Sequence, residues 1–292
     1  MLRIALPNKG RLADDTRELF NDAGLEVRTR SERALTASLG GLFEAIFVRA
    51  QDIPEFVADG AADVGVTGWD LVSESERPLT CLADLEFGRC RLAVAAKEET
   101  GVASLRDIPS GTRVATSFPR ICKRFFIEQG LPVEIVPVSG AAEIAPHLGI
   151  ADIVVDLVST GSTLRTNGLR EVATVLESTA RLIARSESGL GSNRSADVAS
   201  RELPDLVTAL QSVLRARGQR YIMANVPRDQ LDAVRAVLPG ITGPTVIDLL
   251  HDNVNVAVHA VAPAAGLYHT VATLKSLGAQ GILVTRIERL MP

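Results

Sequence analysis

The chain has 292 residues, of which 46% are hydrophobic and 23% charged, so its length predicts two domains or three small ones. Its net charge of −4 and isoelectric point near 5.7 argue against a nucleic-acid-binding protein, which needs a basic face. The three cysteines form no Cys-x-x-Cys pair, and the four histidines are too scattered to indicate a zinc site. These counts favour a reducing environment and exclude a disulfide-built fold.

No stretch of the sequence approaches the roughly 18 consecutive apolar residues of a membrane-spanning helix. The first residues lead directly into a strand pattern, without the features of a secretory signal. We therefore expect a cytoplasmic protein that binds neither a membrane nor nucleic acid.

The first predicted unit is a strand at residues 2–6, a loop, and a helix at residues 12–23. The loop contains Lys9 and Arg11. In open α/β sheets, ligands bind outside the carboxyl ends of the strands, so these cations are candidates to hold a polyphosphate. An ordinary solvated loop is an equally open interpretation.

Two further strands are predicted in this first part of the chain. The strand at residues 42–48 leads into Arg49, and a short helix is predicted at residues 51–59. The strand that begins at Asp63 runs into a turn bracketed by glycines, whose candidate binding residues are Gly65, Thr67, Gly68 and Asp70. Glycines there allow a flat ring or a phosphate to lie against the backbone, but they are also common in turns that bind nothing.

The middle of the chain predicts a second group of strands and helices. A strand is predicted at residues 90–96, a crossing loop at 97–104, a strand at 113–116, a helix at 121–130 and a strand at 133–138. A helix is then predicted to open at Ser139–Glu143. Glu143 lies in its first turn, where an acid is favourable beside the helix dipole without any binding role.

The most informative stretch follows a predicted strand at residues 152–158. There the apolar run ends in hydroxyl side chains around a glycine, where a helix can begin, and such junctions leave backbone N–H groups free to bind a phosphate. Asp156 repels phosphate but suits a ribose diol. The predicted site comprises Asp156, Leu157, Val158, Ser159, Thr160, Gly161, Ser162 and Thr163. A simple helix cap remains the alternative.

The last part of the chain has a different pattern. Strands at 171–176 and 180–184 are predicted to return to the first lobe, and a helix is predicted at 197–217 with a break at Pro204. Then follow a strand at 221–226, a helix at 229–238, strands at 245–250 and 254–261, a helix at 266–277 and a strand at 281–287. This β-α-β-β-α-β order is the ferredoxin-like unit, a module suited to effector binding or to oligomerisation.

Several motifs along the whole chain together resemble the ATP phosphoribosyltransferase family in its long, self-regulated form. They are Leu6-Pro-Asn-Lys9-Gly-Arg11-Leu, Asp63 through Gly68, Phe87-Gly-Arg-Cys-Arg-Leu92, Thr116-Ser-Phe-Pro119, Ser139-Gly-Ala-Ala-Glu143, Asp156-Leu-Val-Ser-Thr-Gly-Ser-Thr163, Gln219-Arg-Tyr-Ile-Met223 and Leu277-Gly-Ala279. The resemblance also accounts for Val155, which stands where most other phosphoribosyltransferases have a second acid before Asp156.

The resemblance implies an α/β fold with a two-lobed catalytic unit of the periplasmic-binding-protein type, that is, a type IV phosphoribosyltransferase, followed by an ACT-like domain. We expect lobe I at residues 1–92 and 172–212, lobe II at 93–171 and the ACT-like domain at 213–292. The implied reaction joins adenine N1 of ATP to C1 of phosphoribosyl diphosphate and releases pyrophosphate, with Mg²⁺ carried by the substrate rather than by a protein metal site.

The same resemblance implies roles for the candidate residues. Lys9, Arg11 and Arg49 would stabilise the leaving charge. Glu143 and the stretch from Asp156 to Thr163 would bind phosphoribosyl diphosphate, and the turn with Gly65, Thr67, Gly68 and Asp70 would lie by ATP. L-Histidine is the expected inhibitor, bound by Asn225, Thr245 and Leu283, with AMP as a second one, and the protein is expected to form homo-oligomers, dimers and hexamers. A non-catalytic two-lobed binding or sensing protein is the alternative, because a fold does not fix a function.

Overall fold

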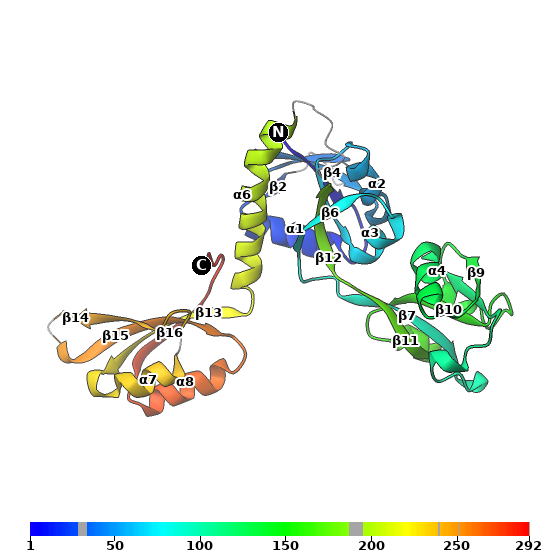
Figure 1. The fold of residues 1–292 in the computed structure, drawn as a ribbon. Coiled ribbons are helices and arrows are strands. Elements are labelled where there is room, and N and C mark those ends of the chain that lie inside the picture. The colour runs from blue at the N-terminus through cyan, green and yellow to red at the C-terminus, as the bar shows by residue number, and fades with distance from the viewer. Residues whose placement is uncertain (29–33, 187–194, 239, 251, 292) are drawn as a thin grey trace. The chain divides into compact units, whose positions relative to one another are not determined.

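The computed structural model describes residues 1–28, 34–186, 195–238, 240–250 and 252–291, with the backbone alone for residues 195–201. The chain divides into a unit of residues 1–207 and a unit of residues 208–292 (Figure 1). Among the described residues, no helix is both long enough and apolar enough to cross a bilayer.

The first sheet of the larger unit has seven strands within the described residues. In sheet order they are β2 (Val27–Arg28), β3 (Thr36–Leu39), β4 (Phe43–Val48), β1 (Arg3–Pro7), β5 (Val64–Gly68), β12 (Ala180–Arg185) and β6 (Leu79–Asp84). Strand β1 is parallel to both β4 and β5, so the loops after these three strands meet at one edge. The helices of this part are α1 (Ala13–Asp22), α2 (Ile53–Ala58) and α3 (Trp69–Ser75).

The second sheet has five strands within the described residues. In sheet order they are β11 (Leu169–Ser178), β7 (Cys90–Lys97), β10 (Ile153–Val158), β8 (Arg113–Thr116) and β9 (Glu134–Pro137). Strand β10 pairs parallel with β8 and antiparallel with β7, so the sheet is mixed at this strand. Helix α4 (Pro119–Glu128) buries Ile121, Cys122 and Phe126 in this core, and α5 (Ser162–Thr166) follows β10.

The chain does not pass from one sheet to the other at the predicted lobe boundaries. The boundaries 92/93 and 171/172 fall inside β7 and β11, and both strands lie in the five-stranded sheet. The prediction that residues 171–176 return to the first lobe is therefore wrong, because β11 pairs with β7 from its first residue, Leu169, to its last, Ser178. The chain changes sheet between β6 and β7 and again between β11 and β12. The two-lobed α/β fold itself is confirmed.

Two local predictions fail for identifiable physical reasons. The helix expected at Ser139–Glu143 is a single 3-10 turn, Ala142–Ile144, because Ala141 has a left-handed backbone with φ of 49° that an α-helix cannot continue. The break expected at Pro204 is also absent from α6 (Ser195–Ala216). A proline removes one helical hydrogen bond, but here the apolar residues after it, Leu206, Leu210 and Val213, are buried and hold the helix together.

The smaller unit contains β13 (Gln219–Pro227), α7 (Leu231–Val237), β14 (Thr245–Leu249), β15 (Asp252–Pro263), α8 (Leu267–Ser276) and β16 (Gln280–Arg286). Its sheet order is β14-β15-β13-β16, with all pairs antiparallel, so the predicted ferredoxin-like unit is confirmed (Figure 1). Alternate residues of β13, such as Ile222 and Ala224, pack into one core with Val234 of α7 and Leu274 of α8. Both α7 and α8 pack on this same core, and residues such as Met223 and Asn225, which alternate with the core residues of β13, are exposed.

Candidate functional site

A cavity of about 400 Å³ opens where β10 ends and α5 begins. Gly161 separates the two elements with φ of +74°, a conformation that favours glycine. The cavity is lined by Glu143, Asp156, Leu157, Val158, Ser159, Thr160, Gly161, Ser162, Thr163 and Leu164. The structure thus brings together every residue predicted for the phosphoribosyl site. Because α5 has only five residues, backbone N–H groups and hydroxyls rather than a long helix dipole would attract an anion here.

The loop of this cavity offers backbone donors as well as hydroxyls. Among the described residues, none accepts a hydrogen bond from the N–H of Thr160 or of Gly161. The Thr160 and Ser162 hydroxyls lie 2.9 Å apart and share a hydrogen bond. An anion seated on this loop can therefore meet two N–H groups that lose no protein partner on binding.

Two carboxyl groups lie side by side in the cavity. Asp156 is partly buried, and its Oδ1 accepts a hydrogen bond of 2.7 Å from the Leu157 N–H. Burial raises the pKa of the Asp156 carboxyl, and the negative charge of the neighbouring Glu143 adds to the rise, whereas the Leu157 N–H opposes it. Such a pair suits hydroxyl donors or a cation placed between the two carboxyl groups.

Two arginines that the sequence analysis did not select contact the same loop. Arg91 Nε and Nη2 donate to the two carboxylate oxygens of Glu171 at 2.7 and 2.6 Å, and Arg91 Nη1 lies 3.4 Å from the Ser159 carbonyl. Arg165 Nη1 lies 3.4 Å from the Thr160 carbonyl. Arg91 stands in the motif from Phe87 to Leu92, but its position opposite Val158 depends on the β7–β10 register, which no local pattern reveals.

The three predicted catalytic cations lie on loops of the first sheet. Lys9, Arg11 and Arg49 are all exposed, and they follow the neighbouring parallel strands β1 and β4. Arg11 Nη1 donates to the Gly88 carbonyl at 2.6 Å, and Arg11 Nη2 lies 3.8 Å from Asp70 Oδ1. Arg11 thereby contacts the segment in which the chain changes from the first sheet to the second.

The predicted ATP-binding residues are mostly buried and have protein partners. Asp70 is 1% exposed, and its Oδ1 accepts a 2.5 Å hydrogen bond from the hydroxyl of Ser178, the last residue of β11. A Cβ on Gly68 would lie 2.2 Å from Asp70 Oδ1, so glycine leaves room for this carboxylate. The Thr67 hydroxyl donates to the Ala50 carbonyl at 2.7 Å, and Gly65 packs against Ile53 and Val57 of α2. Each residue therefore has a structural role of its own.

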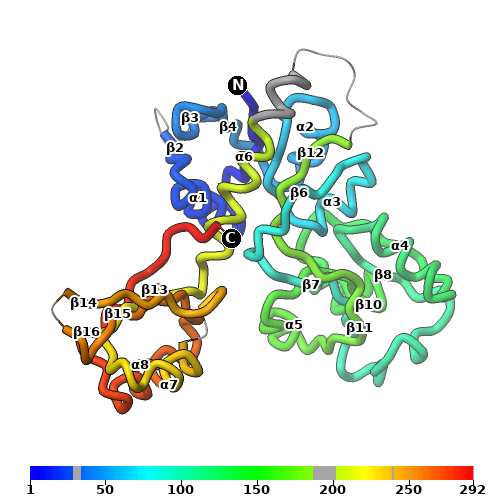
Figure 2. The backbone as a smooth tube through the Cα atoms, turned by 60° about the vertical axis from the view of Figure 1, so that its left-hand side comes forward, coloured from blue at the N-terminus to red at the C-terminus, as the bar shows by residue number. Residues whose placement is uncertain are grey.

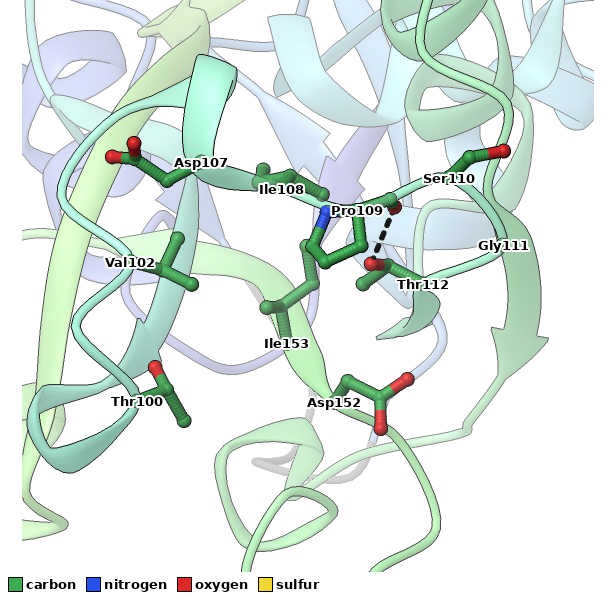
Figure 3. A pocket seen from close by; sticks show the side chains of 10 residues that line it. All are labelled: Thr100, Val102, Asp107, Ile108, Pro109, Ser110, Gly111, Thr112, Asp152 and Ile153. Atoms are coloured by element: carbon green, nitrogen blue, oxygen red, sulfur yellow. Dashed lines mark hydrogen bonds between the residues drawn. The ribbon is translucent and has the colours of Figure 1, made fainter.

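A second cavity, of about 420 Å³, lies at the opposite, amino ends of β8 and β10 (Figure 3). Its two carboxylates are both engaged: Asp107 accepts hydrogen bonds from Ser104 and from the Ala103 N–H, and Asp152 accepts two from Arg113. Its apolar part comes from residues such as Ile108 and Ile153. Since ligands of open α/β sheets bind at the carboxyl ends of the strands, the cavity beside Asp156 is the better candidate site.

The three predicted effector residues of the smaller unit share the sheet face opposite its helices. Thr245 pairs with His259, His259 with Met223, and Met223 with Leu283, so these four residues form one row across the sheet. Asn225 lies two residues after Met223 on β13 and is exposed as Met223 is. The structure therefore places Asn225, Thr245 and Leu283 on one open face.

Comparison with known proteins agrees with these observations. A family model described as ATP phosphoribosyltransferase matches residues 49–212, and one described as the HisG C-terminal domain matches residues 216–289. The chain is 69% identical to an ATP phosphoribosyltransferase of Gemmatimonas aurantiaca and 48% identical to one of Natronomonas pharaonis, each over the full length of both chains. Among solved structures, the ATP phosphoribosyl transferase (HisG:HisZ) complex from Thermotoga maritima contains a chain with TM-score 0.61 and 26% identity, covering 74% of this chain and 99% of that one.

Proposed function

Since the chain belongs to the ATP phosphoribosyltransferase family, we propose that its phosphoribosyl site is the cavity at the end of β10. The protein is a transferase that joins adenine N1 of ATP to C1 of phosphoribosyl diphosphate with release of pyrophosphate, the first step of histidine biosynthesis. The observation that carries the proposed site is that Asp156 and the loop from Ser159 to Thr163 line one cavity. The alternative of a non-catalytic binding protein gains no support from these relatives.

Within this site, Asp156 accepts hydrogen bonds from the ribose hydroxyls, and the loop binds the 5-phosphate. The free N–H groups of Thr160 and Gly161, with the hydroxyls of Ser159, Ser162 and Thr163, supply donors that phosphate oxygens accept. Glu143 supplies a second carboxylate beside the ribose. Asp156 and Gly161 are close together in the chain and line the same cavity, so one ribose 5-phosphate can place its diol at Asp156 and its phosphate at Gly161.

The leaving diphosphate develops negative charge while positive charge develops on the ribose ring. Preorganised cations stabilise such a leaving group because they need no reorganisation as the charge forms. We assign this role to Lys9, Arg11 and Arg49, whose loops meet at one edge of the first sheet. Adenine N1 carries a free lone pair, so the reaction requires no protein nucleophile, and correct positioning of the two substrates contributes much of the rate.

Magnesium is proposed to arrive with the diphosphate of the substrate. Among the described residues, no group of three or more His, Cys, Asp or Glu side chains is arranged so that it could hold a metal ion. The residues present nevertheless fit Mg²⁺, because the adjacent carboxylates of Glu143 and Asp156 are hard oxygen donors whose mutual repulsion a cation relieves. When bound, the ion neutralises charge on the diphosphate oxygens.

We propose that ATP binds beside the turn from Gly65 to Asp70. Within this segment, Gly65 to Gly68 belong to β5 and Trp69 and Asp70 begin α3, and because β5 pairs with β1, the junction lies at the same sheet edge as the loop with Lys9 and Arg11. The contact of Arg11 with Asp70 connects the two loops. Because Gly65, Thr67 and Asp70 are buried, their contribution to ATP binding would be to shape the turn.

The carboxyl pair predicts a shift in pH dependence. Only ionised Asp156 accepts both ribose hydroxyls, so kcat/KM for phosphoribosyl diphosphate should fall as the pH drops through the raised pKa of Asp156. Glu143→Gln removes the neighbouring negative charge and lowers the Asp156 pKa, which moves the acid limb of the profile to lower pH. Titration of the substrate phosphates is common to both proteins and cancels in the comparison. An acid limb that stays in place in Glu143→Gln would contradict the pairing.

Feedback inhibition by L-histidine through the smaller unit is part of the same proposal, with AMP as a second inhibitor. The open sheet face with Asn225, Thr245 and Leu283 offers a hydroxyl, an amide and an apolar side chain to an amino acid. We expect Thr245→Leu to keep the uninhibited rate and to lose histidine sensitivity, by a factor on the order of 5–150, which is the usual range of coupling between sites. Initial rates at increasing histidine concentration test this, and unchanged inhibition would place the effector elsewhere.

Self-assembly into dimers and hexamers and a cytoplasmic location complete the proposal. The open face of the smaller unit supports assembly, since it leaves apolar side chains such as Leu283 exposed. All three cysteines are free thiols, which supports a reducing compartment.

The catalytic proposal is tested by mixing the protein with ATP, phosphoribosyl diphosphate and Mg²⁺. Pyrophosphate should appear only when both substrates are present, and release without ATP would contradict the transfer.

A further inference from the structure

In the loop from Ser159 to Thr163, the direction of each backbone N–H group depends on where the carbonyl group of the preceding residue points. In a trans peptide the C=O of one residue and the N–H of the next point in opposite directions. No cis peptide occurs among the described residues. A group that holds the Ser159 carbonyl on one side therefore turns the Thr160 N–H to the other side. The same relation connects the Thr160 carbonyl with the Gly161 N–H, and neither of these two N–H groups has an acceptor among the described residues.

Each of these carbonyls has a guanidinium beside it. Arg91, from β7, reaches the Ser159 carbonyl, and Arg165, from α5, reaches the Thr160 carbonyl, both at 3.4 Å. Figure 2 shows β7, β10 and β11 side by side in the second sheet, so one arginine approaches the loop from a neighbouring strand and the other from the element that follows the loop. Two consecutive peptides are thus held in the orientation that a bound anion needs.

Arg91 is itself held in place. Glu171 accepts from its Nε and Nη2 in a bidentate pair, and the two side chains are only 33% and 29% exposed. The Arg91 hydrogen bonds lower the pKa of the Glu171 carboxyl, so Glu171 stays ionised at neutral pH. A bidentate pair fixes the plane of the guanidinium and leaves Nη1 free to face the loop. Glu171 therefore determines where the third donor of Arg91 points.

Gly161 favours the contact of Arg165 with the loop. A Cβ on Gly161 would lie 3.2 Å from Arg165 Nη1, close enough that the guanidinium would have to shift slightly, and the φ of +74° also disfavours a side chain. The glycine thus leaves room for the guanidinium as well as for the turn.

On the basis of the proposed phosphoribosyl site, we propose that Arg91 is a positioning residue for the substrate 5-phosphate. Clamped by Glu171, it ties back the Ser159 carbonyl so that the Thr160 N–H faces the phosphate. Arg165 does the same for the Gly161 N–H, and the two guanidinium charges add to the attraction for a dianion. Neither arginine needs to touch the substrate to act in this way.

The test compares Arg91→Met with Arg113→Met. Arg113 Nη2 donates to Asp152 at 3.1 Å, a single side-chain hydrogen bond, and stands at the opposite ends of the strands, so it controls for the loss of an arginine–carboxylate pair away from the site. We expect Arg91→Met to raise KM for phosphoribosyl diphosphate about tenfold, the effect of losing a hydrogen bond from a charged group, while KM for ATP changes less than about twofold. Arg113→Met should change neither KM. Equal effects of the two substitutions, or equal rises in both KM values, would overturn the assignment.

A double-mutant cycle tests the role of Glu171. Glu171→Gln should weaken binding of phosphoribosyl diphosphate in the wild-type background and have no further effect in Arg91→Met, because it acts only through that arginine. Arg91→Lys should fall between wild type and Arg91→Met, since a lysine keeps one donor but cannot form the bidentate pair. Additive effects of Glu171→Gln and Arg91→Met would overturn the clamp.

Titration calorimetry with ribose 5-phosphate separates this inference from the function on which it rests. Wild-type protein that binds ribose 5-phosphate, together with Arg91→Met protein that binds it about tenfold more weakly, would support both. Equal binding by the two proteins would overturn the role of Arg91 alone. If Asp156→Asn and Ser162→Ala also leave wild-type binding unchanged, the ligand does not occupy this cavity and the proposed site fails.

Discussion

Asp156→Asn is expected to lower kcat/KM for phosphoribosyl diphosphate about 10- to 100-fold, because hydrogen bonds to a charged group contribute roughly 1.5–3 kcal/mol. Asparagine has the same shape and its oxygen can still accept the 2.7 Å hydrogen bond from the Leu157 N–H, so the fold should be preserved. What it loses is the charge that attracts two hydroxyl hydrogens and the positive ribose ring. Steady-state rates at varied phosphoribosyl diphosphate, with ATP in excess, measure the effect.

Asp152→Asn is the matched control for this substitution. Asp152 immediately precedes the same strand, but its carboxylate is bonded to Arg113 at the far end of the sheet. Its replacement should cost some stability and leave kcat/KM within about twofold of wild type, as expected away from the site. Normal kinetics in folded Asp156→Asn protein, or an equal loss in Asp152→Asn, would remove Asp156 from the site.

Gly65→Ala is expected to lower the free energy of unfolding by about 1–3 kcal/mol, the usual cost of overpacking a core. A Cβ at Gly65 would lie 2.4 Å from Ile53 Cγ2 and 2.9 Å from Val57 Cγ2. Both side chains are fully buried, so α2 can make room only by moving away from β5. The single tryptophan, Trp69, stands at the start of α3 just after β5, and its fluorescence during urea unfolding reports on this part of the fold.

Gly140→Ala provides the control, because a Cβ there meets nothing within 4 Å. Its free energy of unfolding should change by less than about 0.5 kcal/mol, or increase slightly as the unfolded chain loses freedom. If Gly65→Ala instead keeps wild-type stability while KM for ATP rises, the glycine serves the close approach of a ligand, as the sequence pattern first suggested, and the packing explanation is wrong.

The local patterns of the sequence were sufficient to predict the strand–loop–helix junction around Gly161 and the smaller unit. The change from an apolar run to hydroxyls around Gly161 involves adjacent residues, so a short window contains the whole signal. The order of the smaller unit is likewise readable, since its two longest strands, β13 and β15, alternate between a face that packs on the helices and an open face, as Ile222 and Met223 do.

The failures concern interactions between residues distant in sequence. The assignment of residues 171–176 to the wrong sheet could not be avoided, because an apolar strand does not reveal which neighbour it pairs with. Arg91 was missed for the same reason: its partners Glu171 and Ser159 are 80 and 68 residues away. Asp70 was selected as a ligand contact, and only the structure shows that Ser178 and Arg11 surround it.

Smaller errors have local causes that outweigh average propensities. Strands β2 and β3 are short, and β2, which lies at the edge of the sheet, has only two residues, too few for any periodicity to show. Helix α3 begins directly after Gly68, so the glycines that indicated an open turn instead precede a helix whose first turn contains Asp70. The left-handed Ala141 ended a helix that the composition of the segment favoured.

A crystal structure of the protein with phosphoribosyl diphosphate and Mg²⁺ tests the central claim most directly. The account predicts the 5-phosphate on the loop after β10, with its oxygens about 2.7–3.1 Å from the N–H groups of Thr160 and Gly161, and the ribose hydroxyls on Asp156. A 5-phosphate found at the turn after β5, or in the cavity between Asp107 and Asp152, with the loop from Ser159 to Thr163 bare, would contradict it.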